Sequence, residues 1–162
     1  MFRKARLKDL DLIEDIAKSA ITFLKDHGID QWNNGYPNKE VFLEDIKLER
    51  GFLLDDIAYV AIILDGDPNY LKIDGAWRQD SKYAVLHRTM VKSTLTNKGI
   101  GKRLFLSAQD YIKKMGYEYI RIDTHKDNFI MRHLLEKLDY KLCGTITLAY
   151  DKSKREAYDK LL

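Results

Sequence analysis

The stretch HRTMVKSTLTNKGIGKRLFLSAQDYIKKM, from His87 to Met115, decides the fold. Its first part completes an alternating pattern of β-branched and polar residues over 83–91, which predicts a strand. Two glycines, Gly99 and Gly101, follow in a Gly-x-Gly turn. The last part predicts an amphipathic helix, because its apolar residues recur on one stripe: Ile100, Leu104, Ala108, Tyr111 and Met115.

The glycine turn has the features of a phosphate site. Glycines at the point where a strand becomes a helix allow a ligand to approach the backbone closely. The first N–H groups of the helix and the positive end of its dipole attract anions, and Lys98, Lys102 and Arg103 add positive charge. Such a turn is also common as a plain tight connection, so the turn alone leaves both interpretations open.

The composition is that of a soluble globular protein. The 162 residues predict one domain, 1–162, with 45% hydrophobic and 33% charged residues. The 28 basic and 25 acidic residues are too evenly balanced for a nucleic-acid-binding face. The single cysteine, Cys143, fits a reducing compartment. No apolar run approaches the roughly 18–20 residues that span a bilayer, and the start of the chain does not resemble a signal peptide. We therefore expect a cytoplasmic protein that does not bind membranes.

The periodicity along the chain predicts an α+β fold with layered helices and strands. The helices are expected at 9–28, 38–51, 100–115 and 128–138, and the strands at 2–6, 52–54, 57–64, 83–91, 117–125 and 141–148. Residues 69–82 are expected as a partly ordered connection, and the tail 151–162 as a short helix or a strand followed by a helix. A doubly wound fold would require more regular alternation of strands and helices.

Two motifs in this order resemble those of the GNAT superfamily of N-acetyltransferases. Residues 96–101, TNKGIG, resemble the family's Gln/Arg-x-x-Gly-x-Gly/Ala signature. Residues 128–140, NFIMRHLLEKLDY, resemble its asparagine-led helix that ends in Tyr-Glu-Lys-Leu-Gly-Phe. The resemblance implies a mixed, mostly antiparallel sheet of six to seven strands flanked by four or five helices. It also implies that the fourth and fifth strands splay apart.

The resemblance implies acetyl-coenzyme A as the cosubstrate. No metal is expected, because Asp123, His125 and His133 lack a recognised ligand spacing with a third partner. In this family the backbone of the glycine turn holds the pyrophosphate, and the fourth strand pairs with the extended pantetheine arm. The helix-start asparagine, Asn128, is expected beside the cofactor. The implied cofactor-binding residues are Thr89, Met90, Val91, Thr96, Asn97, Lys98, Gly99, Ile100, Gly101, Lys102, Arg103 and Asn128.

Three residues depart from the family pattern. Thr96 stands where the family usually has Gln or Arg, which removes a long polar side chain from the turn. Leu135 stands at the position of the tyrosine that is proposed to protonate the leaving thiolate, and leucine cannot donate a proton. Asp139 replaces a glycine at the end of the helix, a milder change because Asp tolerates the left-handed conformation.

The candidates for the catalytic base are two histidines. Val85 aligns with the glutamate that serves as base in the family's histone-modifying members, so that base is absent. His87 lies two residues further on the same face of its strand, and imidazole ordinarily titrates near pH 6.5. His125 shares a strand face with Asp123. Each histidine has a second interpretation, which is to orient substrate or to complete hydrogen bonds at a strand end.

The implied function is transfer of an acetyl group to a primary amine of a small molecule or a protein. The candidates for amine binding are Trp32, Tyr36, Trp77 and Asp123, although aromatic rings in a loop also anchor it to the core. The resemblance implies direct transfer in a ternary complex. Cys143 has no predicted basic neighbour that would activate it for an acyl-cysteine route. The alternative is a weakly catalytic coenzyme A-binding module that acts as a sensor. Since members of the family often dimerise, the resemblance also implies a homodimer, through the final strand and tail.

Overall fold

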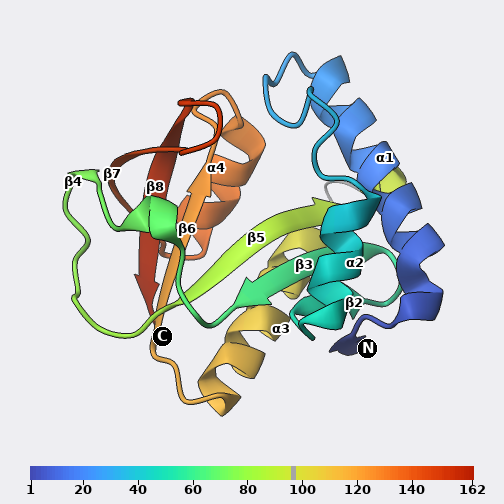
Figure 1. Ribbon diagram of the computed structural model, residues 1–162, viewed down its shortest axis with the longest axis horizontal. Helices are drawn as coiled ribbons and strands as arrows, with labels where there is room; N and C mark the ends of the chain where they lie inside the picture. Colours follow the sequence, from blue (N-terminus) through green and yellow to red (C-terminus); the bar gives the residue numbers. More distant parts are fainter. Residues whose placement is uncertain (96–97) are drawn as a thin grey trace. The chain divides into compact units, whose positions relative to one another are not determined.

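The computed structural model describes residues 1–95 and 98–162 (Figure 1). The four α-helices are α1 Leu10–Asp26, α2 Lys39–Lys47, α3 Ile100–Lys114 and α4 Phe129–Lys137. Three short 3-10 helices are η1 Leu7–Asp9, η2 Pro68–Tyr70 and η3 Ser93–Leu95. The strands are β1 Phe2–Lys4, β2 Gly51–Leu54, β3 Ala58–Ile63, β4 Asp74–Gly75, β5 Ala84–Val91, β6 Tyr119–Thr124, β7 Lys141–Thr147 and β8 Lys154–Leu161.

The strands form one sheet in the hydrogen-bonded order β1-β2-β3-β5-β6-β8-β7-β4. The pairs β1–β2, β2–β3, β4–β7, β6–β8 and β7–β8 are antiparallel, whereas β5 and β6 are parallel. The predicted α+β fold with a mostly antiparallel sheet is confirmed. The ladder between β5 and β6 joins Ala84 to Ile120 and Val85 to Arg121, at the start of each strand.

The sheet has eight strands, close to the expected six to seven, and the strands β4 and β8 each have a clear cause. The two-residue strand β4 lies in the expected connection 69–82, where Asp74 and Gly75 pair with Thr145 and Gly144 of β7. The tail forms the strand β8 at 154–161, which one of the two expected alternatives included, but the helix expected in both alternatives is not formed there. Since β6 and β7 pair with β8 on its two sides, ladder hydrogen bonds outweigh the helical preference of the sequence.

The chain divides into two compact units. The first contains residues 1–62 and 87–108, and the second contains 63–86 and 109–162. The boundaries fall inside β3, β5 and α3, so each of these elements contributes to both units. The single domain over 1–162 stays a prediction.

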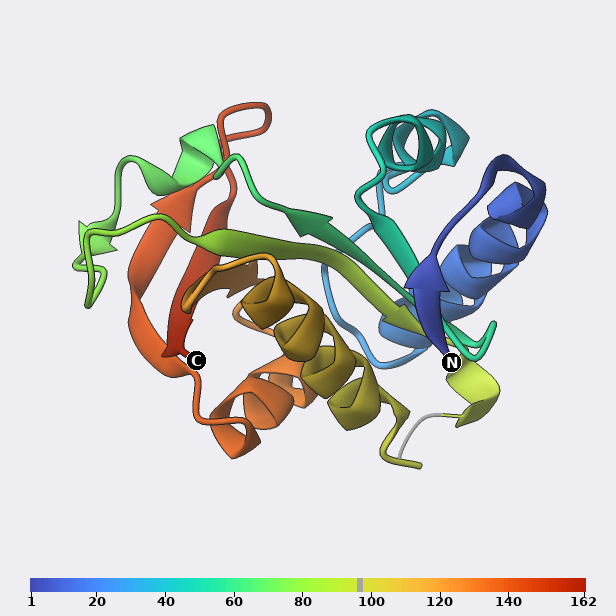
Figure 2. The same cartoon turned by 90° about the horizontal axis from the view of Figure 1, so that it is seen from below.

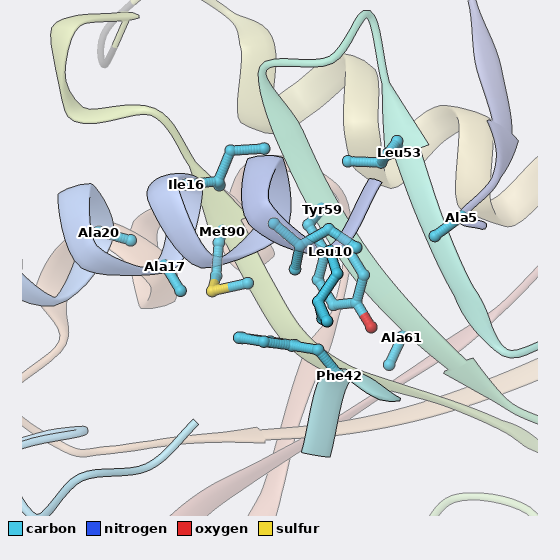
Figure 3. Close-up of a cluster of buried hydrophobic side chains, with 11 residues drawn as sticks. Ala5, Leu10, Ile16, Ala17, Ala20, Phe42, Leu53, Tyr59, Ala61 and Met90 are labelled. Carbon is cyan, nitrogen blue, oxygen red and sulfur yellow. The ribbon is translucent and has the colours of Figure 1, made fainter. Parts of the chain in front are cut away.

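The core of the first unit lies between α1, α2 and the strands β2, β3 and β5. Figure 3 shows Phe42 of α2, Tyr59 of β3 and Met90 of β5 gathered along α1. The inward residues of α1 are those that its 3.6-residue period predicts: Leu10, Ile13, Ile16, Ala17, Ala20 and Leu24. The C-terminal part of β5 is therefore fixed in position by its own apolar side chains.

The core of the second unit gathers Tyr70, Val85, Ile146 and Ala157, with β8 beside β7 (Figure 2). A buried carboxylate, Asp159 of β8, fastens the connection before β5 to this core. It accepts hydrogen bonds from Arg78 Nε at 2.5 Å and from the Tyr119 hydroxyl at 2.7 Å. None of the helices within the described residues has the length and apolar character required to cross a membrane.

Candidate active site

The path from β5 to α3 is held in place by contacts within the first unit. After β5, the backbone N–H of Lys92 donates to the Ile57 carbonyl at 2.9 Å. The short helix η3 is fixed to α1, because Ser19 Oγ accepts from the Ser93 N–H at 2.8 Å and lies 2.7 Å from Ser93 Oγ. These contacts set the direction in which the chain enters the glycine turn.

The described part of the turn has the backbone and charge that an anion requires. Gly99 has φ +72°, and a Cβ there would meet nothing within 4 Å, so this backbone is open. The first hydrogen bond of α3 runs from the Arg103 N–H to the Gly99 carbonyl at 3.1 Å, and the N–H groups of the first turn precede it. Lys98 and Lys102 are exposed on either side. The residues present therefore fit a pyrophosphate.

The remaining predicted cofactor residues are placed in different ways. Arg103 is exposed, and its Nη2 pairs with Asp55 Oδ2 at 2.5 Å, so its predicted contact with the cofactor stays a prediction. The side chain of Met90 is buried in the core, which leaves its backbone for a ligand, while Thr89 and Val91 are half-buried. Ile100 is also buried. Thr96 and Asn97, which were predicted to contact the pyrophosphate, lie outside the described residues.

Arg88 has an unusual backbone and a buried ion pair. Its φ is +52° in the middle of β5, a left-handed conformation that is rare for a residue with a side chain. Its guanidinium contacts both carboxylate oxygens of Asp45, with Nε 2.9 Å from Oδ2 and Nη2 2.7 Å from Oδ1. Burial acts to lower the pKa of Arg88, but Tyr36 and Asp45 together raise it above its ordinary value. The two-point pair holds the left-handed residue in the strand.

Asp45 is the centre of this network. Its side chain is fully buried, and it also accepts from Arg50 Nε at 2.7 Å and from the Tyr59 hydroxyl at 2.6 Å. Burial, followed by the charge of Asp45, raises the pKa of Tyr59 well above its ordinary value. The sequence reasoning missed Asp45 and Arg88. The available signal was the spacing of Asp45 three residues after Phe42, which puts a carboxylate on the apolar face of α2.

Tyr36 is attached to this network through its hydroxyl. Arg88 Nη1 donates to the Tyr36 oxygen at 2.9 Å. A guanidinium has no acceptor, so the phenol keeps its own hydrogen, and no described residue accepts it. The ring is half-buried in the loop between α1 and α2. Trp32 of the same loop has φ +61° and packs against the core of the first unit. Tyr36 thus carries a fixed hydrogen-bond donor.

In the second unit, Trp77 and Asp123 are both engaged with Tyr70. Trp77 Nε1 donates to the Tyr70 carbonyl at 3.0 Å, and its ring lies beneath the Arg121 guanidinium, 4.5 Å from the ring centre. Asp123 Oδ2 accepts from the Tyr70 hydroxyl at 2.6 Å. Burial and the charge of Asp123 raise the pKa of Tyr70. Trp77 and Asp123, which were predicted to bind the amine substrate, therefore also have a role in packing.

His125 and Asn128 lie in the segment that links β6 to α4. The Nδ1 atom of His125 accepts from the Asp127 N–H at 3.1 Å, so in the neutral imidazole the hydrogen is on Nε2. Asn128 is buried, and its side-chain oxygen caps α4 by accepting from the Met131 N–H at 3.1 Å. His87, by contrast, is half-exposed in the first unit, beside the left-handed Arg88.

Cys143 and the acidic and histidine side chains bear on the two alternatives to direct transfer, an acyl-cysteine route and a metal site. Burial, followed by a hydrogen bond to Asp159, raises the pKa of the Cys143 thiol to about 12, which disfavours the thiolate that an acyl-cysteine route would need. Among the described residues, no group of three or more His, Cys, Asp or Glu side chains is arranged to hold a metal ion. Leu135, at the family's tyrosine position, is fully buried in α4.

Comparison with known proteins settles the family. Residues 23–140 match the model of the acetyltransferase (GNAT) family. The chain belongs to the GNAT acetyltransferase family. No protein in the curated collection matches.

Solved GNAT structures agree with this assignment. A GNAT-family acetyltransferase from Streptococcus agalactiae is 29% identical, with a TM-score of 0.88 over 100% of this chain and 95% of that one. A PaiA N-acetyltransferase from Thermoplasma acidophilum, crystallised in complex with coenzyme A, shares the fold. It is 21% identical, with a TM-score of 0.70 over 100% of this chain and 98% of the other.

Proposed function

We propose that this GNAT protein is an acetyl-coenzyme A-dependent N-acetyltransferase that acts on a primary amine by direct transfer in a ternary complex. The observation that carries the proposal is the open turn at Gly99, at the start of α3, in a chain that belongs to the GNAT family. A structural relative crystallised with coenzyme A supports the choice of cosubstrate. The amine is that of a small molecule or of a protein or peptide.

The cofactor would be held by backbone more than by side chains. The N–H groups at the start of α3 bind the pyrophosphate, with Lys98 and Lys102 adding charge. The backbone of Thr89 to Val91 pairs with the pantetheine arm, since the arm is an extended chain with amide groups. When bound, acetyl-coenzyme A supplies an activated thioester. Asn128 caps α4 in the second unit, and its place beside the cofactor stays a prediction.

Within this proposal, the first unit provides the groups that act on the amine. His87 accepts the proton of the amine, directly or through water. We choose it over His125 because Nδ1, the nitrogen of neutral His125 that could accept a proton, already accepts from the Asp127 N–H. A backbone N–H of β5 polarises the thioester carbonyl. Tyr36 contacts the amine substrate with the hydrogen that its hydroxyl does not share with Arg88. The leaving thiolate is not protonated by Leu135, because a leucine side chain has no proton to donate.

The buried Leu135 favours a second candidate function, a coenzyme A-binding module with little catalysis. The two candidates differ in turnover. A thiol-release assay with acetyl-coenzyme A and a panel of primary amines should show release that depends on the amine for an enzyme. Release that is no faster with any amine than without it would contradict the enzyme and favour the binding module.

The role of His87 has its own test in the same assay. Replacing the imidazole in His87→Gln should lower kcat/KM by about 10²–10⁴-fold, the usual contribution of a general base. It should also remove the acidic limb of the pH–rate profile. His125→Gln is the matched comparison, because it makes the same substitution at the histidine that is not the base in this proposal. A His87→Gln profile that keeps the wild-type shape would rule out His87 as the base.

A further inference from the structure

A basic pocket lies entirely within the second unit. It has a volume of about 300 Å³ and is lined by His125, Lys126, Thr145 and residues 153–156. Strand register brings these segments together, because Glu156 of β8 pairs with Thr124 of β6 on one side and with Thr145 of β7 on the other. The pocket therefore opens at the end of β6, where the chain turns toward α4.

Arg155 is the buried cation of this pocket. Only 9% of its surface is exposed. Its Nη1 donates to Ser153 Oγ and to the Lys154 carbonyl, both at 3.0 Å. Within the described part of the chain no carboxylate pairs directly with Arg155, and Asp151 reaches it only through Ser153 Oγ, at 2.6 Å. A largely buried charge that lacks a direct counter-ion in the protein is an unusual arrangement, because burial of a charge is costly unless it is paired.

The unused donors of Arg155 are accessible to a ligand. Its Nε and Nη2 have no acceptor among the described residues, yet neither is a fully buried unpaired atom. Both atoms therefore reach solvent, and Arg155 lines the pocket. Two free N–H donors in a fork are the geometry with which arginine binds a carboxylate or a phosphate at two points.

The other lining groups are mostly donors too. His125 is 13% exposed at its side chain and carries its hydrogen on Nε2 in the neutral form, because Nδ1 accepts from the backbone. Lys126 and Lys154 add two exposed ammonium groups. Glu156 is the one carboxylate in the lining, and it acts electrostatically on Arg132 outside the pocket. Asp127, 3.7 Å from His125 Nδ1, is half-exposed beside the pocket.

We propose that this pocket binds an oxyanion, a carboxylate or a phosphate group. Arg155 binds the anion at two points, His125 donates from Nε2, and the two lysines add long-range attraction.

The binding step is tested first without any amine, by titrating the protein with succinate and, separately, with inorganic phosphate. The probes are the NMR shifts of the His125 imidazole and of the Arg155 Nε–H. We expect saturable shifts at both groups, and the tighter of the two anions identifies the acidic group. Shifts that increase linearly without saturation, for both anions, would overturn the proposal.

Variants then connect the binding to particular side chains. Arg155→Gln should weaken anion binding at least tenfold. Lys154→Gln should weaken it about threefold, and because Lys154 is exposed this variant tests the pocket even if Arg155→Gln folds poorly. Lys141→Gln, an exposed lysine of β7 outside the pocket, is the control of equal charge and should bind as the wild type does. Equal weakening of anion binding in Lys141→Gln and Lys154→Gln would mean that only the net charge of the protein matters, and it would overturn the proposed site.

Discussion

The carboxylate of Asp45 holds together three parts of the first unit: the helix α2, the strand β5 and, through Arg88, the loop that carries Tyr36. A buried pair of this kind is costly to break from one side, because the remaining charge loses its partner. We expect Asp45→Asn or Arg88→Met to lower the free energy of unfolding by about 3–5 kcal/mol in urea denaturation.

The double variant Asp45→Asn/Arg88→Met is the control for this prediction. It removes both charges at once, so its loss of stability should be smaller than the sum of the two single losses. Additive losses would mean that the two side chains act independently, which would contradict the ion pair.

In the proposed function, the Tyr36 hydroxyl links the Asp45–Arg88 ion pair to the amine substrate. In Tyr36→Phe the ring stays and the donor is lost, so we expect KM for the amine to rise severalfold while the affinity for coenzyme A is unchanged. Steady-state kinetics and calorimetry measure the two quantities on the same preparation. A Tyr36→Phe variant with wild-type KM would remove Tyr36 from amine binding.

At the start of α3, the glycine turn is tested by two matched glycines. Gly99 and Gly28 have similar backbones, φ +72° and +67°, and in each case a Cβ would meet nothing within 4 Å. Alanine in this conformation costs about 1 kcal/mol at either position. Thermal unfolding should therefore show similar losses for Gly99→Ala and Gly28→Ala. Only Gly99→Ala should weaken coenzyme A binding. Equal affinities for coenzyme A in the two variants would mean that the turn at Gly99 does not bind the cofactor.

The elements show what the sequence could and could not predict. The period of α1 and the asparagine caps of α2 and α4 identified these helices, because the signals are local. The tail was harder to predict, since β8 depends on partners that are distant in sequence. The same limit applies to the site. The glycine turn is a local motif, whereas the Asp45–Arg88 pair and the pocket at Arg155 are formed by residues that only the fold brings together.

At the scale of the whole molecule, the buried carboxylate of Asp159 links stability to pH. Burial acts to raise the pKa of Asp159, but hydrogen bonds from Arg78 and Tyr119 outweigh it, and the folded-state pKa is lowered from 3.8. A lowered folded-state pKa contributes stability that is present above the unfolded value and is lost as the pH falls through the folded one. We therefore expect the free energy of unfolding to fall as the pH drops below about 4.

Asp159→Asn should be less stable than the wild type near pH 7 and should show a flatter decline in acid. Asp110→Asn, an exposed change on α3, is the control and should follow the wild-type curve. Denaturant titrations between pH 7 and 3 measure both. A wild-type curve that does not decline in acid, or an Asp159→Asn curve that declines equally steeply, would contradict this account of Asp159.

The cytoplasmic location and the homodimer stay predictions.

The central claim is that the turn at Gly99 binds the phosphates of acetyl-coenzyme A. Calorimetric titration of the full chain with acetyl-coenzyme A tests it directly, with dephospho-coenzyme A and pantetheine as the comparison ligands. We predict saturable one-to-one binding of acetyl-coenzyme A and dephospho-coenzyme A, which both carry the pyrophosphate, and much weaker binding of pantetheine, which lacks it. Absence of binding at micromolar protein, or equal binding of pantetheine, would contradict the claim.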